Sequence, residues 1–197
     1  MDVSSHALTR MVLQHDGSTT RILTCLLGEP LKVRVLRQHD EAASALAPHV
    51  SAHLKLSSED HAIVRRSQLV RATGEAVSLN TVIMVPSRHP IVAAISEADD
   101  VPLGHILAQH VPGHHRRILN HGTVWHDAWS DLDRHCAYRE YLICLESEPI
   151  LYIQEVFSPE IVPAAPRSDA ALQVHSDLLL MPTSPERVGA SAPPPSW

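Results

Sequence analysis

The chain has 197 residues, of which 44% are hydrophobic and 19% charged, so it is long enough for one domain with a sizeable core. A formal net charge of −6 argues against general nucleic-acid binding, and no apolar run reaches the length of a membrane span. The N-terminus lacks the charged-then-apolar order of a signal peptide, and Cys25, Cys136 and Cys144 follow no pairing pattern. We therefore expect a cytoplasmic protein with reduced thiols.

The N-terminal region predicts two helices separated by a turn. Residues 6–14 carry apolar side chains at helical spacing. Gly17 then breaks the chain, and Ser18 or Thr19 can cap a second helix that ends near Gly28. A turn before a helix also presents unpaired backbone N–H groups, which suit a carboxylate ligand, although a plain helix cap explains the same residues.

Six later segments have the pattern of β-strands, at 31–37, 62–72, 76–85, 115–125, 137–145 and 150–157. Further short helices are expected at 86–95 and 102–109, with a helical piece inside the loop 40–60. Because most strands have short connections, we expect a mainly antiparallel sheet in an α+β domain. After Pro159 the chain becomes rich in Pro, Ala and Ser, which predicts a domain over 1–162 and a flexible tail over 163–197.

Arginine recurs within the expected strands. Arg65 and Arg66 are adjacent on one strand, so their side chains point to opposite faces of the sheet. One of the two must face inward or lie under a neighbouring element. An inward guanidinium needs an anionic partner, which can be a protein carboxylate or a ligand.

The last strand carries a carboxyl group among apolar residues. Glu155 lies between Ile153 and Phe157, at positions typical of a core, where a carboxyl is costly unless it is hydrogen-bonded, paired or protonated. It is either a satisfied structural acid or a group suited to acid–base chemistry. In one of two favourable hairpin registers Arg139 lies opposite Glu155, and in the other Tyr141 does. Such a face holds either a buried ion pair or a pocket for a small anion.

Several histidines gather in one third of the chain, next to one cysteine: His105, His110, His114, His115, His121, His126, His135 and Cys136. Their spacing matches no HExxH or CxxC…H zinc motif, so surface positions explain most of them. The sequence has no GxSxG, GxGxxG or P-loop pattern, which argues against a serine nucleophile and against nucleotide cofactors.

The order of several motifs resembles the chorismate pyruvate-lyase family, of the compact bacterial type that makes 4-hydroxybenzoate. The matching blocks are DGSTTRIL at 16–23, RRSQLVRATGE at 65–75, VPLGHILA at 101–108, RRILNHG at 116–122 and REYLICLESEPILYIQEVFSP at 139–159. No single block is specific, but the combination of GSxTR, PLG, RxY and ExF in this order is typical of the superfamily.

The resemblance implies a six-stranded antiparallel sheet covered by short helices that enclose a ligand cavity, with no metal and no organic cofactor. It implies that Glu155 and Arg66 are catalytic, with Arg65 as the alternative to Arg66 if the register slips by one residue. The other residues implied to contact the substrate are Gly17, Ser18, Thr19, Leu103 and Arg139. One departure is Thr81-Val82, where some members of the family carry a further arginine that would bind a second carboxylate.

The implied reaction converts chorismate, a small dianion, to 4-hydroxybenzoate and pyruvate. Arg66 and the turn at 17–19 would hold the ring carboxylate. Glu155 would act as a general acid on the leaving group, kept in its acid form by its apolar neighbours. Neither nucleic acid nor a membrane is an expected partner.

Two alternatives remain open at the level of sequence. The same fold serves as the effector-binding domain of bacterial transcription regulators, so the chain could be a non-catalytic module that binds aromatic acids; no helix-turn-helix is visible before residue 8. It could also be a related lyase that forms a different hydroxybenzoate, because sequence does not determine where protons are taken and given.

Overall fold

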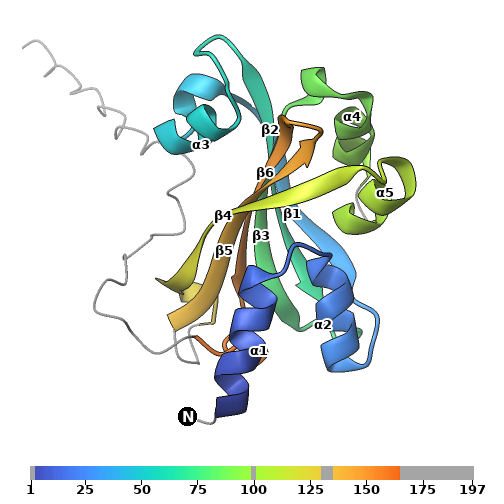
Figure 1. The fold of residues 1–197 in the computed structure, drawn as a ribbon, viewed down its shortest axis with the longest axis vertical. Helices are drawn as coiled ribbons and strands as arrows, with labels where there is room; N and C mark the ends of the chain where they lie inside the picture. The colour runs from blue at the N-terminus through green and yellow to red at the C-terminus, as the bar shows by residue number, and fades with distance from the viewer. Residues whose placement is uncertain (1–2, 99–100, 130–134, 165–197) are drawn as a thin grey trace, which may run out of the picture.

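The computed structural model describes residues 3–98, 101–129 and 135–164, which form one six-stranded antiparallel sheet with short helices around it (Figure 1). The strands are β1 (Lys32–Ala42), β2 (His61–Val70), β3 (Ala76–Met84), β4 (His114–Trp125), β5 (His135–Leu145) and β6 (Glu148–Phe157). The helices are α1 (Val3–Gln14), α2 (Thr19–Leu27), α3 (Pro48–His53), α4 (Pro90–Glu97) and α5 (Leu103–His110), with 3₁₀ turns η1 (Ala43–Ala45), η2 (Pro86–Arg88) and η3 (Asp127–Trp129). The expected α+β fold is confirmed.

The strand order is β1-β2-β3-β6-β5-β4, so the hairpins β2–β3 and β5–β6 meet through β3 and β6 in the middle of the sheet. All neighbouring strands are antiparallel. Every residue of β6 after Glu148 is buried, because helices cover both faces of the central strands. A polar side chain on β6 therefore lies in the protein interior.

Four groups of buried side chains lie on the two faces of the sheet, and the three largest pack against the α-helices. On one face, α3 packs against residues that include Val64, Ile83 and Tyr152. On the other face, α4 and α5 pack against the end of the sheet that carries Ile143, while α1 and α2 pack against the end that carries Phe157.

Two expected elements differ clearly from the structure. The helix expected at 86–95 is a 3₁₀ turn followed by α4, and β1 continues to Ala42 instead of ending at residue 37. Its second half pairs with β2 although its sequence, QHDEA, lacks apolar alternation. Two glycines end elements with positive φ, Gly28 at the end of α2 (φ 69°) and Gly74 in the β2–β3 turn (φ 89°). Nearly all of the expected tail, from residue 165 onward, lies outside the described residues.

Candidate functional site

Glu155 lies on the central strand β6, with only 5% of its surface exposed. In the sheet register it is opposite Asn80 of β3 on one side and Arg139 of β5 on the other. Of the two registers left open by the sequence, the structure has the one that pairs Glu155 with Arg139. The two residues therefore share one interior face.

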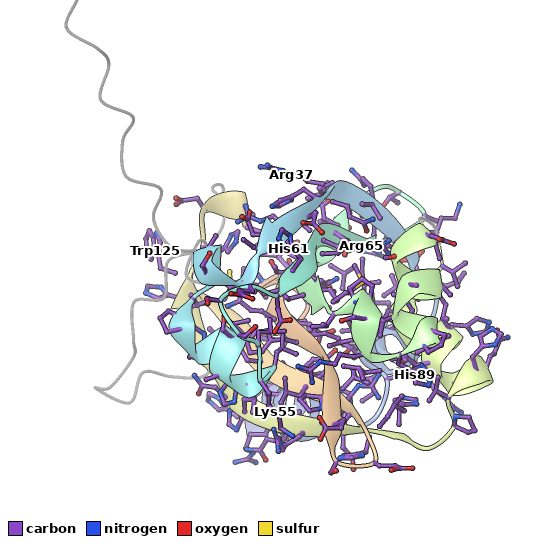
Figure 2. The ribbon with its side chains drawn as sticks, turned by 90° about the horizontal axis from the view of Figure 1, so that it is seen from above. Arg37, Lys55, His61, Arg65, His89 and Trp125 are labelled. Atoms are coloured by element: carbon purple, nitrogen blue, oxygen red, sulfur yellow. The ribbon has the colours of Figure 1, made fainter. Side chains whose placement is uncertain are left out.

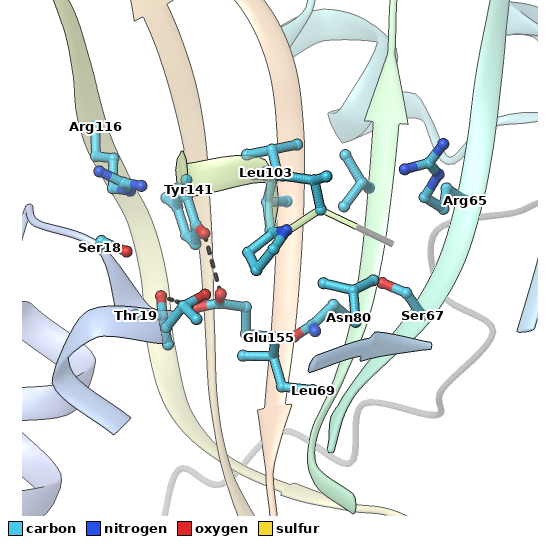
Figure 3. A pocket seen from close by; sticks show the side chains of 17 residues that line it. Ser18, Thr19, Arg65, Ser67, Leu69, Asn80, Leu103, Arg116, Tyr141 and Glu155 are labelled. Carbon is cyan, nitrogen blue, oxygen red and sulfur yellow. Dashed lines mark hydrogen bonds between the residues drawn. The ribbon is translucent and has the colours of Figure 1, made fainter. Parts of the chain in front are cut away.

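Three side chains donate hydrogen bonds to the Glu155 carboxylate. Arg139 Nε donates to Oε2 over 2.7 Å. Thr19 Oγ1 donates to Oε2 over 2.9 Å, and the Tyr141 hydroxyl donates to Oε1 over 3.1 Å (Figure 3). An ionised carboxylate only accepts hydrogen bonds, so three donors suit the ionised form better than the acid form. Polar residues therefore meet the carboxyl group itself, although its neighbours along the same face of β6, Ile153 and Phe157, are apolar.

The Tyr141 hydroxyl stays protonated and so keeps donating its hydrogen bond to Glu155. Burial, reinforced by the charge of Glu155, raises the pKa of the Tyr141 hydroxyl to about 12. The hydroxyl therefore keeps its proton throughout the physiological pH range and continues to hold Glu155 Oε1 in place.

Arg139 anchors the N-terminal segment to the sheet. Its side chain is fully buried, and Nη1 donates to the backbone carbonyls of Val12 and His15, each over 3.0 Å, while Nη2 donates to the Thr19 hydroxyl. Burial is the largest single effect and opposes the charged form, but the Glu155 carboxylate and the Tyr141 hydroxyl together outweigh it and raise the pKa of Arg139. Arg139 thus remains cationic and holds the end of α1, the start of α2 and Glu155 together.

A pocket opens above Glu155, between the start of α2 and the start of α5. Its polar lining comes from Ser18, Thr19, Thr20, Arg65, Ser67, Asn80, Arg116, Tyr141 and Glu155, and its apolar lining includes Val33, Leu69, Val82, Leu103 and Ile153. A mainly apolar cleft with a few convergent polar groups is the usual form of a small-molecule site. The guanidinium groups of Arg65 and Arg116 at its margins suit an anionic ligand.

Of the two adjacent arginines, Arg65 lines this pocket and Arg66 does not. Ser67 pairs with Asn80, which pairs with Glu155, so Ser67 and Arg65 share the face of Glu155. Arg66 lies on the opposite face, in a separate hollow with Gln154. The first choice of the sequence analysis is therefore placed away from the pocket, and its alternative is placed inside it.

Arg65 is 6% exposed and is held at the end of α4, above β2 (Figure 2). Its Nη1 donates to the carbonyl of Ala98 over 2.8 Å, its Nη2 to the carbonyl of Ser96 over 2.9 Å, and its Nε to Gln38 Oε1 over 2.5 Å. A guanidinium fixed in this way presents its charge at a defined side of the pocket.

The structure places the remaining expected site residues as follows. Ser18 and Leu103 line the pocket, whereas Gly17 does not, and the side chain of Thr19 is directed at Glu155 and Arg139. The Ser18 hydroxyl caps α2 by accepting from the backbone N–H of Arg21 over 3.3 Å. Gly104 lets α5 approach this cap, because a Cβ there would lie 3.0 Å from Ser18 Oγ.

Among the described residues, no group of three or more His, Cys, Asp or Glu side chains could hold a metal ion. No helix in the same part of the chain is long and apolar enough to cross a membrane.

A family model described as chorismate pyruvate-lyase, Rv2949c-like, matches residues 13–164, which includes the whole sheet and all the pocket residues named above. The chain belongs to this family. A search of the curated proteins finds no match.

Solved structures with the same fold include several transcription regulators. PhnF from Mycobacterium smegmatis is 13% identical, with a TM-score of 0.59 over 76% of this chain and 67% of that chain. The C-terminal domain of a histidine utilization repressor from Pseudomonas syringae pv. tomato is 11% identical, with a TM-score of 0.52 over 70% of this chain and 98% of that chain. At these identities the likeness shows the fold alone.

Sequence reasoning about this member of the chorismate pyruvate-lyase family assigned no role to two residues near Glu155, and it named a third, Tyr141, only as the alternative to Arg139 opposite Glu155. Tyr141 shares the strand parity of Arg139, and the structure brings both side chains to the Glu155 carboxylate. Arg116 lies within the RRILNHG block next to Arg117, and the two side chains point to opposite faces of the sheet. Only the register of β4 on β5 decides which of them faces the pocket. His15 lies in a loop where the sequence carries no such signal.

His15 makes stability sensitive to moderately acidic pH. Burial, reinforced by the charge of Arg139, lowers the pKa of His15 from 6.5 to about 4, and both ring nitrogens are buried without a hydrogen-bond partner. Between these two pH values the unfolded chain binds a proton that the folded protein excludes, so stability falls as pH decreases from about 6.5 to about 4. Burial also lowers the pKa of His53, which acts in the same direction.

Between pH 7 and pH 4.5 the free energy of unfolding should fall by about 1–2 kcal/mol less in the His15→Gln variant than in the wild type. This value is smaller than the full pKa shift implies, because the residue is partly exposed. Urea unfolding at pH 7 and pH 4.5 measures the difference. His110→Gln, which changes an exposed histidine, is the matched control. Equal pH dependence in the wild type and in His15→Gln would contradict the assignment.

Proposed function

We propose that this protein is a lyase that converts chorismate to 4-hydroxybenzoate and pyruvate. The observation that carries the proposal is the Glu155 carboxylate, held by Arg139, Thr19 and Tyr141 at the base of a pocket that also presents Arg65. Its membership of the chorismate pyruvate-lyase family supports the same reaction. Chorismate is an anion of the size and polarity that such a pocket suits.

The reaction makes modest chemical demands on the protein. The bond between ring carbon C3 and the ether oxygen breaks, and its electron pair leaves with enolpyruvate. A proton leaves C4, and the ring becomes aromatic as 4-hydroxybenzoate. Enolpyruvate takes a proton on its methylene carbon and becomes pyruvate. Since aromatisation supplies much of the driving force, the protein has to hold the substrate in a reactive shape and manage protons.

The proposed roles follow from the positions of the side chains. Arg65 binds the ring carboxylate, and the apolar residues Leu103 and Ile153 contact the ring. Glu155, held in place by its three donors, accepts the C4 proton. This differs from the role of general acid expected from sequence, because the surroundings of the carboxyl group are polar.

Non-catalytic binding of aromatic acids is the second candidate. It is favoured by the likeness in fold to the effector domain of PhnF from Mycobacterium smegmatis, which is 13% identical with a TM-score of 0.55 over 73% of this chain and 90% of that chain. A related lyase with another hydroxybenzoate as product is a variant of the first candidate. One assay distinguishes the proposed lyase from the binding module and from the related lyase.

Incubation of the purified protein with chorismate and a metal chelator, followed by liquid chromatography–mass spectrometry, tests the proposal. We expect 4-hydroxybenzoate and pyruvate in equal amounts. A different hydroxybenzoate would indicate the related lyase. Unchanged chorismate, together with saturable binding of 4-hydroxybenzoate by a folded protein, would indicate the binding module.

The adjacent arginines provide a matched pair of variants. Arg65→Lys is expected to lower kcat/KM for chorismate about 10- to 100-fold, because lysine keeps the charge but cannot reproduce the two-pronged hydrogen bonding of a guanidinium to a carboxylate. Arg66→Lys, on the opposite face, should change it less than about twofold. Steady-state kinetics with thermal unfolding as a folding check measures both. A larger effect at Arg66 than at Arg65 would contradict the placement.

A further inference from the structure

Arg116, on β4, is a second arginine in the pocket and lies at the opposite side from Arg65 (Figure 3). The strands β2 and β4 are separated by β3, β6 and β5, which puts their backbones four strand spacings apart, or about 19 Å along the sheet. Tyr141 and Leu103 lie between the two arginine side chains (Figure 3). The pocket therefore has a guanidinium at each of two opposed sides.

Few protein groups engage the Arg116 guanidinium. Nη1 donates to the backbone carbonyl of Asp16 over a long 3.3 Å, and the group lies 5.8 Å from the centre of the Tyr141 ring. Its Nε is buried and has no hydrogen-bond partner, and no acidic side chain of the described residues forms an ion pair with it. Arg139 differs, since it meets Glu155, Thr19 and two backbone carbonyls.

Because few protein groups accept hydrogen bonds from the Arg116 guanidinium, this group beside the pocket is available to an anionic ligand. The surroundings keep the group facing the pocket. A Cβ on Gly104 would come within 3.7 Å of Arg116 Nη2, so the start of α5 bounds it on one side. The aromatic face of Tyr141 bounds it on another.

We propose that Arg116 binds the second carboxylate of a dicarboxylate substrate, so that Arg65 and Arg116 hold the two acidic groups at opposite sides of the pocket. The inference rests on the proposed function and deepens it, since the second carboxylate of chorismate is the one on its enolpyruvyl group. Arg116 would also replace the second carboxylate-binding arginine that some members of the family carry on the strand equivalent to β3, because β3 presents Val82 to the pocket here. Arg116 then distinguishes the dianionic substrate from the monoanionic product.

The Arg116→Gln variant tests the inference with two ligands of different charge. The KM for chorismate should rise about 10- to 100-fold with kcat changed less than about threefold, as expected for loss of a charge-assisted contact made throughout the reaction. The Kd for 4-hydroxybenzoate, measured by calorimetry, should change less than about threefold, because the product has no second carboxylate. Arg116→Lys should recover part of the affinity, since the charge remains.

Arg117→Gln is the matched control, because its side chain is exposed and lies outside the pocket lining. Thermal unfolding of each variant checks that the fold is intact. If wild-type protein turns over chorismate but Arg116→Gln weakens both ligands equally, or neither, the inference is overturned and the function stands. If wild-type protein does not turn over chorismate, its Kd can be titrated directly. If Arg116→Gln then weakens the binding of chorismate but not of 4-hydroxybenzoate, the result supports the anion site without the lyase activity. If it does not, the inference is overturned.

Discussion

Replacing Glu155 with glutamine is expected to lower kcat for chorismate at least about 1,000-fold, within the range seen when a group that transfers protons is removed. Glutamine has nearly the same shape, so the pocket keeps its form, but the amide cannot accept the C4 proton. The Kd for 4-hydroxybenzoate should stay within a few fold, because Arg65 rather than Glu155 is proposed to bind the carboxylate. Single-turnover kinetics and calorimetry measure the two quantities separately.

A second buried glutamate provides the control for this experiment. Glu140 is 9% exposed, lies on the other face of the sheet and accepts a hydrogen bond from Gln154 Nε2 over 3.0 Å. Glu140→Gln should leave kcat within about threefold, since it changes a buried carboxyl away from the pocket. Substantial turnover by Glu155→Gln, or loss of binding with the fold unchanged, would contradict the proposed division of roles.

Removing the charge of Arg139 is expected to have the largest effect on stability. In Arg139→Met, the buried Glu155 carboxylate loses its cationic partner, and the carbonyls of Val12 and His15 each lose a donor. Loss of one member of a buried pair costs about 3–5 kcal/mol. For a protein of this size, each kcal/mol corresponds to about 2–4 °C, so the melting temperature should fall by about 10 °C.

Two further variants decide whether the ion pair is the cause. The double variant Arg139→Met/Glu155→Leu should recover part of the loss, since replacing both members removes the unpaired charge. Lys55→Met removes a pair with Glu148 whose side chains are more than half exposed, at 57% and 56%, and should change stability by less than about 1 kcal/mol. A double variant no more stable than Arg139→Met would assign the loss to the backbone contacts instead.

Much of the fold follows from patterns within single strands. Alternation and short connections predict six antiparallel strands because each strand buries its own apolar face. The extension of β1 to Ala42 could not be predicted, since residues 38–41 are polar and residues 38–42 are held in the sheet by pairing with β2. Tertiary pairing there outweighs local preference.

The candidate site shows a different limit. The sequence predicts that Glu155 and Arg139 share a face, but choosing between Arg65 and Arg66 requires the register across two strand pairs. The β2–β3 ladder shifts between Leu69 and Val70, where β3 has one extra residue, so the pairing of the two strands cannot be counted from the turn alone. The resemblance to the family selects Arg66, whereas the pairing of Ser67 with Asn80 places Arg65 in the pocket.

The contacts of Arg139 also constrain the order in which the molecule can assemble. Its bonds to Val12, His15 and Thr19, and the bond from Thr19 to Glu155, join residues that are 120 to 136 positions apart in the chain. On the ribosome the N-terminal helices are made first, yet their anchor on β5 and β6 is made last. The pocket wall formed by α2 therefore closes only after nearly the whole sheet has been synthesised, and docking of the N-terminal helices is expected to be a late folding step.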